Sequence, residues 1–377
     1  MIQPSISPYS APVTLVSKKD EGEKSRLVVD FRALNKITIV DSYPFPRIED
    51  IIDKLHGSKI FTTLDISSGF WYVQMKSENV HKTAFSTQSG HHEFLVCPFG
   101  FRNSPAIFQR AIFRILEKNK LTKFAHNYLD DIMVHSRNFE EHLTHLRAVF
   151  QAMRREEVKF KLSKCHIAEQ RVTYLGHDIS ENEIRPTKDH IIAIQNFPIP
   201  RNKKSLQQLL GKINFNRKFI PNASKNLNPL YELLKINKNF EWTDDCQKAF
   251  DQIKHILTTE PVLKIFNPQK SCSLLTDASK IGIGAVLKQE SDEDKQLHPV
   301  AYFSKKLLSY QQNYSISELE CLAIVESLEY FHHYLYGTKF IVITDHQALK
   351  YLHKMKKPNS RLFKWALKLS QYDFTIE

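Results

Sequence analysis

The chain has 377 residues, which is enough for two or three domains with hydrophobic cores of their own. Lys and Arg number 53 against 41 Asp and Glu, so the formal net charge is +12 and we expect a polyanionic partner. Hydrophobic residues make up 42% and charged residues 25%, which excludes a largely disordered, collagen-like or coiled-coil protein. The five cysteines are scattered without metal-site spacing and are expected to be reduced thiols.

The first part of the chain alternates segments typical of strands with segments typical of helices. Residues 26–31 and 60–66 are rich in β-branched and aromatic side chains, whereas 47–55 has helical spacing of apolar residues. A further helix is predicted over 105–117. Another is expected to begin after Asn138, with Glu141 completing a capping box. This alternation predicts a mixed sheet with helices packed against it.

The middle of the chain changes character after a hinge predicted at 197–204, which contains two prolines and a basic cluster. Residues 186–240 hold ten Lys and Arg but only two Asp and Glu, an excess of 10 − 2 = +8. Such an excess suits a surface that follows a phosphate backbone, although a solvated helical face would have the same composition. A helix is predicted over 243–258, and a strand-rich last domain is predicted to begin near Ser271.

A first set of carboxylates lies at predicted strand ends. Asp130 and Asp131 are adjacent in a tight turn between apolar segments, and Asp65 ends another apolar strand. A solvated turn would explain a bare Asp-Asp pair. Three converging carboxylates, however, can hold two Mg²⁺ ions and carry out phosphoryl transfer.

A second set of three acids follows later in the chain. Asp277 and Asp345 each follow an apolar strand, and Glu320 is expected in the first turn of a helix that begins near Ser317. Gly282 and Gly284 suit a turn between strands. Glu318 competes with Glu320 for the helix position, and either acid could instead complement the helix N-terminus.

Several motifs follow one another along the chain: SPYSAPVTLVSKKD (7–20), RLVVDFRALN (26–35), FTTLDI (61–66), CPFGFRNSPA (97–106), YLDD (128–131), YLGHDIS (174–180), RKFIPN (217–222), HPVAYFSKKL (298–307) and HHYLYGTKF (332–340). Their order and spacing resemble the reverse transcriptase and ribonuclease H region of gypsy-type LTR retrotransposons. The resemblance implies an α+β right-hand polymerase with fingers, palm and thumb. An α/β ribonuclease H-like domain with a mixed sheet is implied after it.

The resemblance also implies residue roles in the polymerase. Asp65, Asp130 and Asp131 would be the catalytic, metal-binding acids, each polymerase or ribonuclease site taking two Mg²⁺, with Mn²⁺ as an alternative. The substrate-binding residues would be Lys18 and Arg26 on the triphosphate, Phe70 as an aromatic gate beneath the sugar, and Tyr128. From their types alone, Lys18 and Arg26 would be surface residues and Phe70 would be core.

The implied ribonuclease H metal ligands are Asp277, Glu320 and Asp345. The implied domains are fingers and palm over 1–185, thumb over 186–240, connection over 241–268, and a ribonuclease H-like domain over 269–377. The implied partners are an RNA template, a DNA primer, RNA–DNA hybrid and deoxynucleoside triphosphates, with no membrane. The oligomeric state is not implied.

The sequence departs from the family at its ends. The final helix that carries a fourth metal-site Asp is absent, and the chain starts almost at the SPYS motif. We therefore expect a fragment, a truncated gene product or a decayed copy, with weakened ribonuclease H activity. The alternative function is a catalytically dead relic that only binds nucleic acid. An intracellular location is expected, in cytoplasmic particles if a complete element is made.

Overall fold

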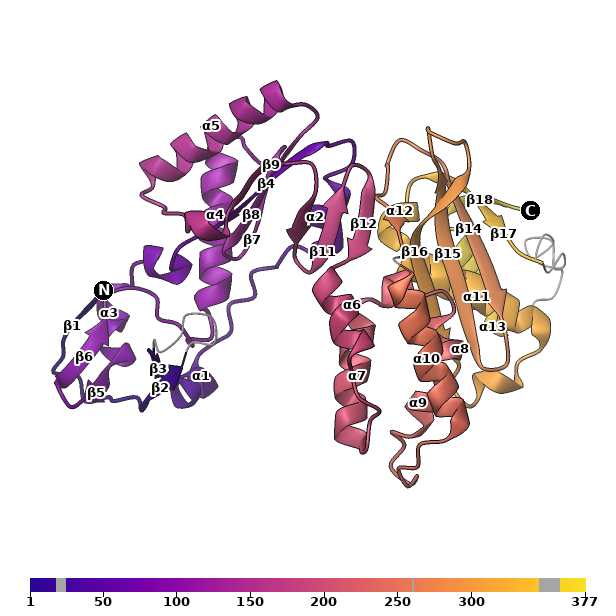
Figure 1. Ribbon diagram of the computed structural model, residues 1–377, viewed down its shortest axis with the longest axis horizontal. Helices are drawn as coiled ribbons and strands as arrows, with labels where there is room; N and C mark the ends of the chain where they lie inside the picture. The colour runs from indigo at the N-terminus through magenta and orange to yellow at the C-terminus, as the bar shows by residue number, and fades with distance from the viewer. Residues whose placement is uncertain (18–24, 260, 346–359) are drawn as a thin grey trace. The chain divides into compact units, whose positions relative to one another are not determined.

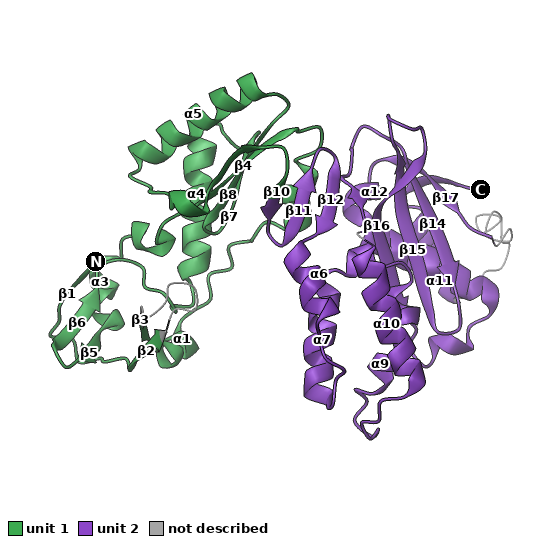
Figure 2. Ribbon diagram, in the orientation of Figure 1, with its two compact units in different colours: residues 1–172 green, residues 173–377 purple. Residues whose placement is uncertain are grey.

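The computed structural model describes residues 1–17, 25–259, 261–345 and 360–377. The chain forms two compact units, Met1–Val172 and Thr173–Glu377, which Figure 2 shows in different colours. Within the described ranges, no helix combines the length and apolar character that crossing a membrane requires. The predicted division at residues 185, 240 and 268 stays a prediction.

The centre of the first unit is a four-stranded sheet in the order β7-β8-β4-β9. Its strands are β4 (Ile60–Asp65), β7 (Ala125–Tyr128), β8 (Asp131–Ser136) and β9 (His166–Glu169), and the long helices are α4 (Ser104–Lys118) and α5 (Phe139–Arg155). Figure 1 shows both helices beside this sheet. Apolar side chains of the strands and of both helices, among them Leu64, Ile132, Phe108 and Val149, form one buried core. We refer to this sheet as the palm sheet.

The remainder of the first unit consists of small sheets and short helices. These elements are β1 (Ile2–Pro4), β2 (Val13–Ser17), β3 (Ser25–Val29), α1 (Arg32–Ile37), α2 (Ile48–Asp53), η1 (Gly69–Tyr72), α3 (Ser77–Val80), η2 (His81–Thr83), β5 (Phe85–Thr87), β6 (Gly90–Phe94) and η3 (Leu162–Lys164). Strands β1, β6 and β5 form one sheet, and β2 pairs with β3. The predicted strand at 26–31 and helix at 47–55 are thus confirmed, each with slightly different bounds.

The second unit begins with a small sheet followed by helices. The strands are β10 (Val172–Tyr174), β11 (His177–Ser180), β12 (Glu183–Pro186) and β13 (Leu263–Lys264), and the helical segments are α6 (Lys188–Gln195), α7 (Lys203–Phe215), η4 (Arg217–Phe219), α8 (Ala223–Asn226), α9 (Asn228–Glu232) and α10 (Asp244–Thr258). The prediction of α10 is confirmed, since the Thr243 side chain caps it by accepting from the Cys246 N–H.

The rest of the second unit is a mixed five-stranded sheet in the order β16-β15-β14-β17-β18. Its elements are β14 (Cys272–Ala278), β15 (Gly282–Glu290), β16 (Leu297–Lys306), η5 (Gln311–Asn313), α11 (Ile316–Tyr330), α12 (His332–Leu335), β17 (Lys339–Ile343), α13 (Ser360–Leu369) and β18 (Asp373–Ile376). Strands β14, β15 and β16 are antiparallel, whereas β17 runs parallel to β14 and β18. The predicted mixed sheet is confirmed.

Three local predictions need correction. Asn138 caps α5 by accepting from the Glu141 N–H, but the Glu141 carboxylate accepts from the Arg137 N–H and does not complete a capping box. Helix α11 is capped by Ser315, so Glu320 lies beyond the first turn. Gly282 and Gly284 lie within β15, not in a turn. In each case residue spacing alone gave the wrong position, because a hydrogen-bond partner or the pairing of strands set the actual conformation.

A cluster of buried histidines lies at the end of the palm sheet opposite to Asp65. His126 Nε2 lies 3.2 Å from His135 Nε2, and the other His135 nitrogen lies 2.7 Å from Ser58 Oγ. His142, which has no exposed surface, bridges Thr62 Oγ1 and Ser136 Oγ at 2.8 Å each. Burial lowers the pKa of His126 to about 3, and that of His135 and His142 to about 4. The folded unit therefore holds these imidazoles neutral.

We predict that acid destabilises the first unit through these histidines. In the unfolded chain their pKa is about 6.5, so below that pH the unfolded state binds protons that the folded state rejects. The free energy of unfolding should fall between about pH 6.5 and 4, by up to about 1.4 kcal/mol per pH unit for each histidine. Urea unfolding at pH 7.5, 6 and 5 measures this slope.

The variants His126→Gln and His135→Gln should each flatten the pH dependence. His166→Gln is the control, because that side chain is 60% exposed. Equal slopes for all of these proteins would show that the cluster does not control acid stability.

Candidate active sites

The palm sheet brings the first three carboxylates together. Asp65 is the last residue of β4, and the strand register pairs it with Asp131, the first residue of β8. Tyr128 and Asp131 pair across the β7–β8 hairpin, so Asp130 lies in a two-residue turn beside them. The convergence predicted from strand ends is therefore present, and it follows from one antiparallel register.

The hairpin turn is held by Gln109 of α4, a residue that the sequence analysis did not single out. Leu129 has a φ of +52°, which is costly for a side chain of its size. Gln109 is 1% exposed, and its Oε1 accepts from the Leu129 N–H at 2.7 Å while its Nε2 donates to the Asn127 carbonyl at 3.0 Å. The buried amide thus fixes the backbone on both sides of the strained residue.

One carboxylate oxygen of Asp130 is packed without a polar partner among the described residues. Its Oδ1 is buried and accepts no hydrogen bond from the described residues. A Cβ atom on Gly69 would lie 2.1 Å from this oxygen, so only glycine fits there. Burial, then Asp131 and Asp65, raise the pKa of Asp130 to about 6. Partial burial and Asp65 also raise the pKa of Asp131.

Lys164 in η3 is a cation that faces these acids. Its Nζ lies 3.5 Å from Asp65 Oδ2, and its charge opposes the upward pKa shifts of Asp130 and Asp131. The side chain is 59% exposed, so it is free to change its contact when another cation or an anion approaches. The sequence around Lys164 did not predict its contact with Asp65, because the two residues lie about 100 positions apart.

The predicted substrate-binding residues have different surroundings. Phe70 in η1 packs against Phe99 at 5.0 Å and Phe108 at 5.5 Å between ring centroids, and is partly buried. Tyr128 ends β7 next to the carboxylates. Arg26 lies in β3 and pairs with Val16, but its side chain lies outside the described part, as does the whole of Lys18.

The second set of carboxylates lies at one edge of the mixed sheet. The parallel register of β14 and β17 pairs Leu275 with Ile343. Asp277 and Asp345 each lie two residues further along, so both are at the same edge. Both side chains are exposed. This arrangement follows from the parallel pairing, which the sequence analysis had not specified.

Helix α11 contributes the third acid of the second set. Glu320 is 4% exposed, and its Oε2 is buried without a hydrogen-bond partner among the described residues. Burial, then Asp345 and Asp277, raise the pKa of Glu320 to about 7. Glu318 instead accepts from the Ser315 N–H at 3.0 Å and from Arg361 at 3.0 Å. Of the two competing acids, Glu320 is the one that faces the aspartates.

The donors in both sets suit a hard divalent cation. Each contains carboxylates that repel one another and a buried oxygen without a partner, on Asp130 and Glu320 respectively. A cation would offset this repulsion. In the described ranges, no three His, Cys, Asp or Glu side chains are already arranged to hold a metal ion. Mg²⁺ commonly takes its remaining ligands from water and substrate phosphates.

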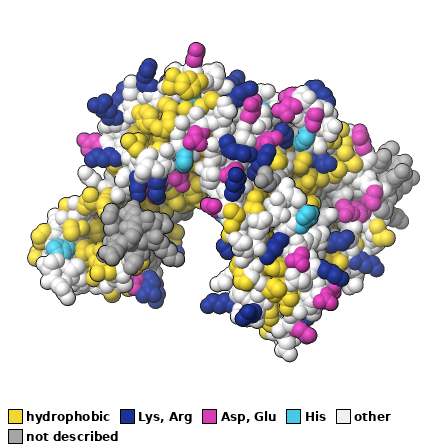
Figure 3. Space-filling view, viewed as in Figure 1, with side chains coloured by type: hydrophobic (Ala, Val, Ile, Leu, Met, Phe, Trp, Pro, Cys, Tyr) yellow, Lys and Arg dark blue, Asp and Glu magenta, His cyan; other side chains and the backbone are white. Residues whose placement is uncertain are grey.

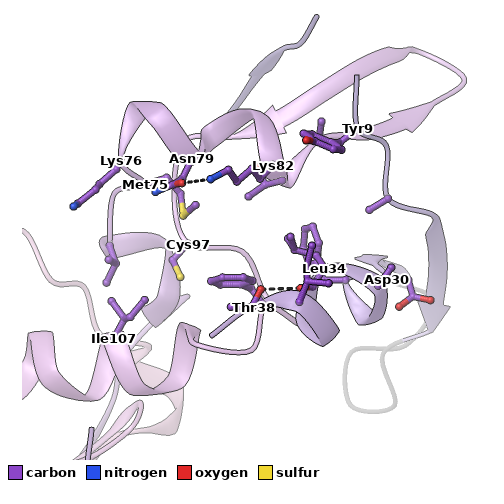
Figure 4. A pocket seen from close by; sticks show the side chains of 18 of the residues that line it. Tyr9, Asp30, Leu34, Thr38, Met75, Lys76, Asn79, Lys82, Cys97 and Ile107 are labelled. Atoms are coloured by element: carbon purple, nitrogen blue, oxygen red, sulfur yellow. Dashed lines mark hydrogen bonds between the residues drawn. The ribbon is translucent and has the colours of Figure 1, made fainter. Parts of the chain in front are cut away.

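A separate hollow of about 890 Å³ lies in the first unit, and Figure 4 shows it from close by. Its lining is mainly apolar. Lys82 Nζ donates to Asn79 Oδ1 at 2.7 Å on one side, and Thr38 Oγ1 donates to the Leu34 carbonyl at 2.8 Å on another. None of the three palm carboxylates lines this hollow, so it has no direct part in their chemistry.

The chain matches two protein families and several curated proteins. Residues 16–179 match the reverse transcriptase (RNA-dependent DNA polymerase) family, and 267–372 match the RNase H-like domain found in reverse transcriptase. It is 39% identical over its whole length to the retrovirus-related Pol polyprotein from transposon 297 of Drosophila melanogaster. It is 38% identical over 97% of its length to the Tf2-3 polyprotein of Schizosaccharomyces pombe. It spans 35% and 28% of those two proteins.

Solved structures of the foamy viral protease-reverse transcriptase have the same fold. One of these, in complex with double-stranded DNA, superposes with a TM-score of 0.89 at 26% identity, covering all of this chain and 79% of that one. Another, in complex with an RNA/DNA hybrid, has a TM-score of 0.81 at 26% identity and is covered to 51%. The right-hand polymerase fold is thereby confirmed.

The families that match use divalent metals in general, which agrees with the donors described above. The family resemblance in the motifs, the two matched domains in their order, and the fold all lead to one assignment. The chain belongs to the reverse transcriptases of retrotransposon Pol polyproteins and carries their RNase H-like domain.

Proposed function

We propose that the chain is an RNA-directed DNA polymerase whose active site is formed by Asp65, Asp130 and Asp131. The observation that carries the proposal is the convergence of these acids around a buried Asp130 oxygen without a partner. A structural role would leave such an oxygen hydrogen-bonded, because burying a polar atom without a partner costs free energy. Side chains that bind metal and position phosphates are sufficient for phosphoryl transfer.

Two Mg²⁺ ions would supply the electrophilic chemistry, lowering the pKa of the attacking hydroxyl and neutralising the leaving pyrophosphate. Asp65 and Asp130 would be the more direct ligands, with Asp131 beside them. The register that pairs Asp65 with Asp131, with Asp130 in the adjoining turn, supports a site that contains all three acids. Mn²⁺ has the same preference for oxygen donors and is a reasonable substitute.

The incoming deoxynucleoside triphosphate would be held by residues around this edge. Arg26 and Lys18 would bind the triphosphate, which suits a forked and a point-like cation respectively. Phe70 would close the space beneath the sugar, and its packing between Phe99 and Phe108 supports a fixed ring position. Tyr128 would contact the substrate from the end of β7.

The second unit would cleave the RNA strand of an RNA–DNA hybrid at Asp277, Glu320 and Asp345, again with two metal ions. The buried Glu320 oxygen without a partner supports this site.

An RNA template, a DNA primer and their hybrid would be the nucleic-acid partners, as the solved foamy viral complexes suggest by analogy. Residues 186–240, with their excess of +8 charges, would form the thumb that contacts phosphates. Figure 3 shows Lys and Arg on exposed parts of both units.

No observation in the described residues favours the alternative of a catalytically dead relic, since all six carboxylates are present, in strands, in the turn or bend beside a strand, or in helix α11. The predicted intracellular location stays a prediction.

We predict that the two sites can be inactivated separately. Asp130→Asn should lower primer extension on an RNA template by about 10²–10³-fold or more, because a metal ligand is lost, and should leave hybrid cleavage within a few-fold. Glu320→Gln should do the reverse. Both activities are measured on one labelled substrate with Mg²⁺, and Glu318→Gln is the matched control for the helix acid. Loss of both activities in either single variant would contradict two independent sites.

We predict that metal binding weakens in two steps as the pH falls. Only ionised carboxylates bind Mg²⁺, and the raised pKa values are about 7 for Glu320 and about 6 for Asp130. Calorimetric titration with Mg²⁺ should therefore lose affinity at the second site below about pH 7, and at the palm site below about pH 6. The Glu320→Gln protein should retain only the lower step. Affinity that is constant from pH 5.5 to 8 would contradict this model.

We predict that Phe70→Ala relaxes the choice of sugar. Removing the ring opens space for a 2′-hydroxyl, so the ratio of deoxynucleotide to ribonucleotide incorporation should fall by about tenfold or more, as expected when a steric contact of about 1.4 kcal/mol is lost. Single-nucleotide incorporation kinetics measure the ratio. Trp71→Ala is the control, since it removes the adjacent aromatic side chain of η1. An unchanged ratio in Phe70→Ala would remove Phe70 from the sugar site.

A further inference from the structure

Residues 217–232, which we call the brace, lie on the mixed sheet of the second unit. The brace comprises η4, α8 and α9, and it directly follows α7 in the basic region. Both η4 and α8 contact β16, and α8 also contacts β15. The brace therefore connects α6 and α7, which we call the basic helices, to the RNase H-like domain within one compact unit.

Strand β15 has a smooth face for the brace because two of its residues are glycine. Ile283, Ala285 and Leu287 point into the buried core, so the alternate residues Gly282 and Gly284 face the other way. A Cβ atom on Gly284 would lie 2.9 Å from Asn222 Oδ1, and one on Gly282 would lie 3.4 Å from Ser224 Cβ. The absent side chains thus permit the close approach.

Gly284 also places the brace beside the second carboxylate set. The strand register pairs Gly284 with Asp277 of β14. Neighbouring strands are about 4.8 Å apart. Asn222 therefore contacts the sheet one strand away from a residue of the proposed ribonuclease site.

Arg217 is the central contact of the brace. Its Nη2 donates to the Ser304 carbonyl of β16 at 2.9 Å and to Ser224 Oγ at 3.0 Å. Its Nη1 lies 3.2 Å from Asn214 Oδ1 and 3.4 Å from the Tyr231 hydroxyl. One guanidinium thus joins the end of α7, α8, α9 and the sheet.

Two further contacts fix the brace to β16. The Ser224 N–H donates to Ser304 Oγ at 2.8 Å. Lys306 Nζ donates to Glu232 Oε1 at 2.5 Å, and Lys235 pairs with the same carboxylate at 2.7 Å. Hydrogen bonds from Lys235 and Lys306 lower the pKa of Glu232 to about 2, so this carboxylate is ionised.

We propose that the brace locks the basic helices to the RNase H-like domain and that Arg217 is its central positioning residue. Nucleic acid held on the helices would then reach Asp277, Glu320 and Asp345 in one register. The positioning of nucleic acid for cleavage rests on the proposed nuclease function. The connection between the helices and the sheet can be tested without nuclease activity.

The test uses the full chain and the variants Arg217→Gln and Ser304→Ala, singly and combined. Arg217→Gln removes a positive charge and could weaken the attraction to phosphates, whereas Ser304→Ala changes no charge. An effect shared by both variants is therefore due to the loss of brace contacts. Lys248→Gln is the control, because it removes one charge from an exposed position on α10 outside the brace. Hydrogen–deuterium exchange is measured in α8 and β16. Hydroxyl-radical footprints of a bound RNA–DNA hybrid are recorded in the Glu320→Gln background, which makes them independent of cleavage.

In both brace variants, amide exchange in α8 and β16 should become about tenfold faster or more, as expected from the loss of a partly buried hydrogen bond. The edge of the footprint should spread over several nucleotides. In the otherwise native chain, the positions of RNA cleavage should broaden to the same extent in both variants. Ser304→Ala, which lies outside the proposed thumb, should change primer extension by less than about twofold. The double variant should add less than the sum of the two single effects, because the Arg217 guanidinium and the Ser304 hydroxyl both bind Ser224.

Unchanged amide exchange in β16 of the brace variants would contradict the proposed connection between the helices and the sheet. Faster exchange with a footprint that stays sharp would show that this connection does not position the bound hybrid. If the native chain binds the hybrid with a sharp footprint but cuts no RNA, the nuclease proposal fails while the brace stands. If the chain cuts RNA but Arg217→Gln leaves exchange, footprint and cleavage positions unchanged, the brace fails while the nuclease proposal stands.

Discussion

The repulsion between carboxylates held at close range is the constraint on which the rest of this structure depends. Acids that repel one another separate unless the backbone prevents it. In the palm sheet, the pairing of Asp65 with Asp131 and the Gln109 contacts on the hairpin prevent it. The result is a half-buried Asp130 with a raised pKa and one buried oxygen without a partner among the described residues. The free energy stored in this arrangement is available to a divalent cation, which relieves the repulsion when it binds.

The two units reach the same chemistry through different topologies. The palm collects its acids from an antiparallel hairpin and the strand beside it, whereas the second unit uses two parallel strand ends and a helix. Each solution includes one carboxylate oxygen that is buried without a hydrogen-bond partner among the described residues, on Asp130 or on Glu320. Because metal ions supply the charge stabilisation, neither site needs a nucleophilic side chain. The fold has only to hold oxygen donors in place.

Much of this organisation could be predicted from the sequence. Strand-end acids such as Asp65, Asp277 and Asp345 follow apolar runs, and that pattern depends only on neighbouring residues. Helix α10 and the cap at Asn138 were predicted for the same reason. The motif order then identified the family. Local predictions failed where another residue made an unexpected contact. The Glu141 carboxylate accepts from the Arg137 N–H and so does not complete a capping box, and Gly282 and Gly284 pack against the brace and do not form a turn.

Sequence by itself determined the residue types available for chemistry and their positions at the ends of elements, because periodicity and capping act over a few residues. Only the tertiary structure decided which of them meet. The contacts of Gln109 with Leu129, of Lys164 with Asp65 and of Arg217 with Ser304 join residues 20, 99 and 87 positions apart. Such contacts depend on strand register and helix packing, which are properties of the whole folded unit. The family resemblance had favoured Glu320 over Glu318, and in the tertiary structure Glu320 is the acid buried beside the aspartates.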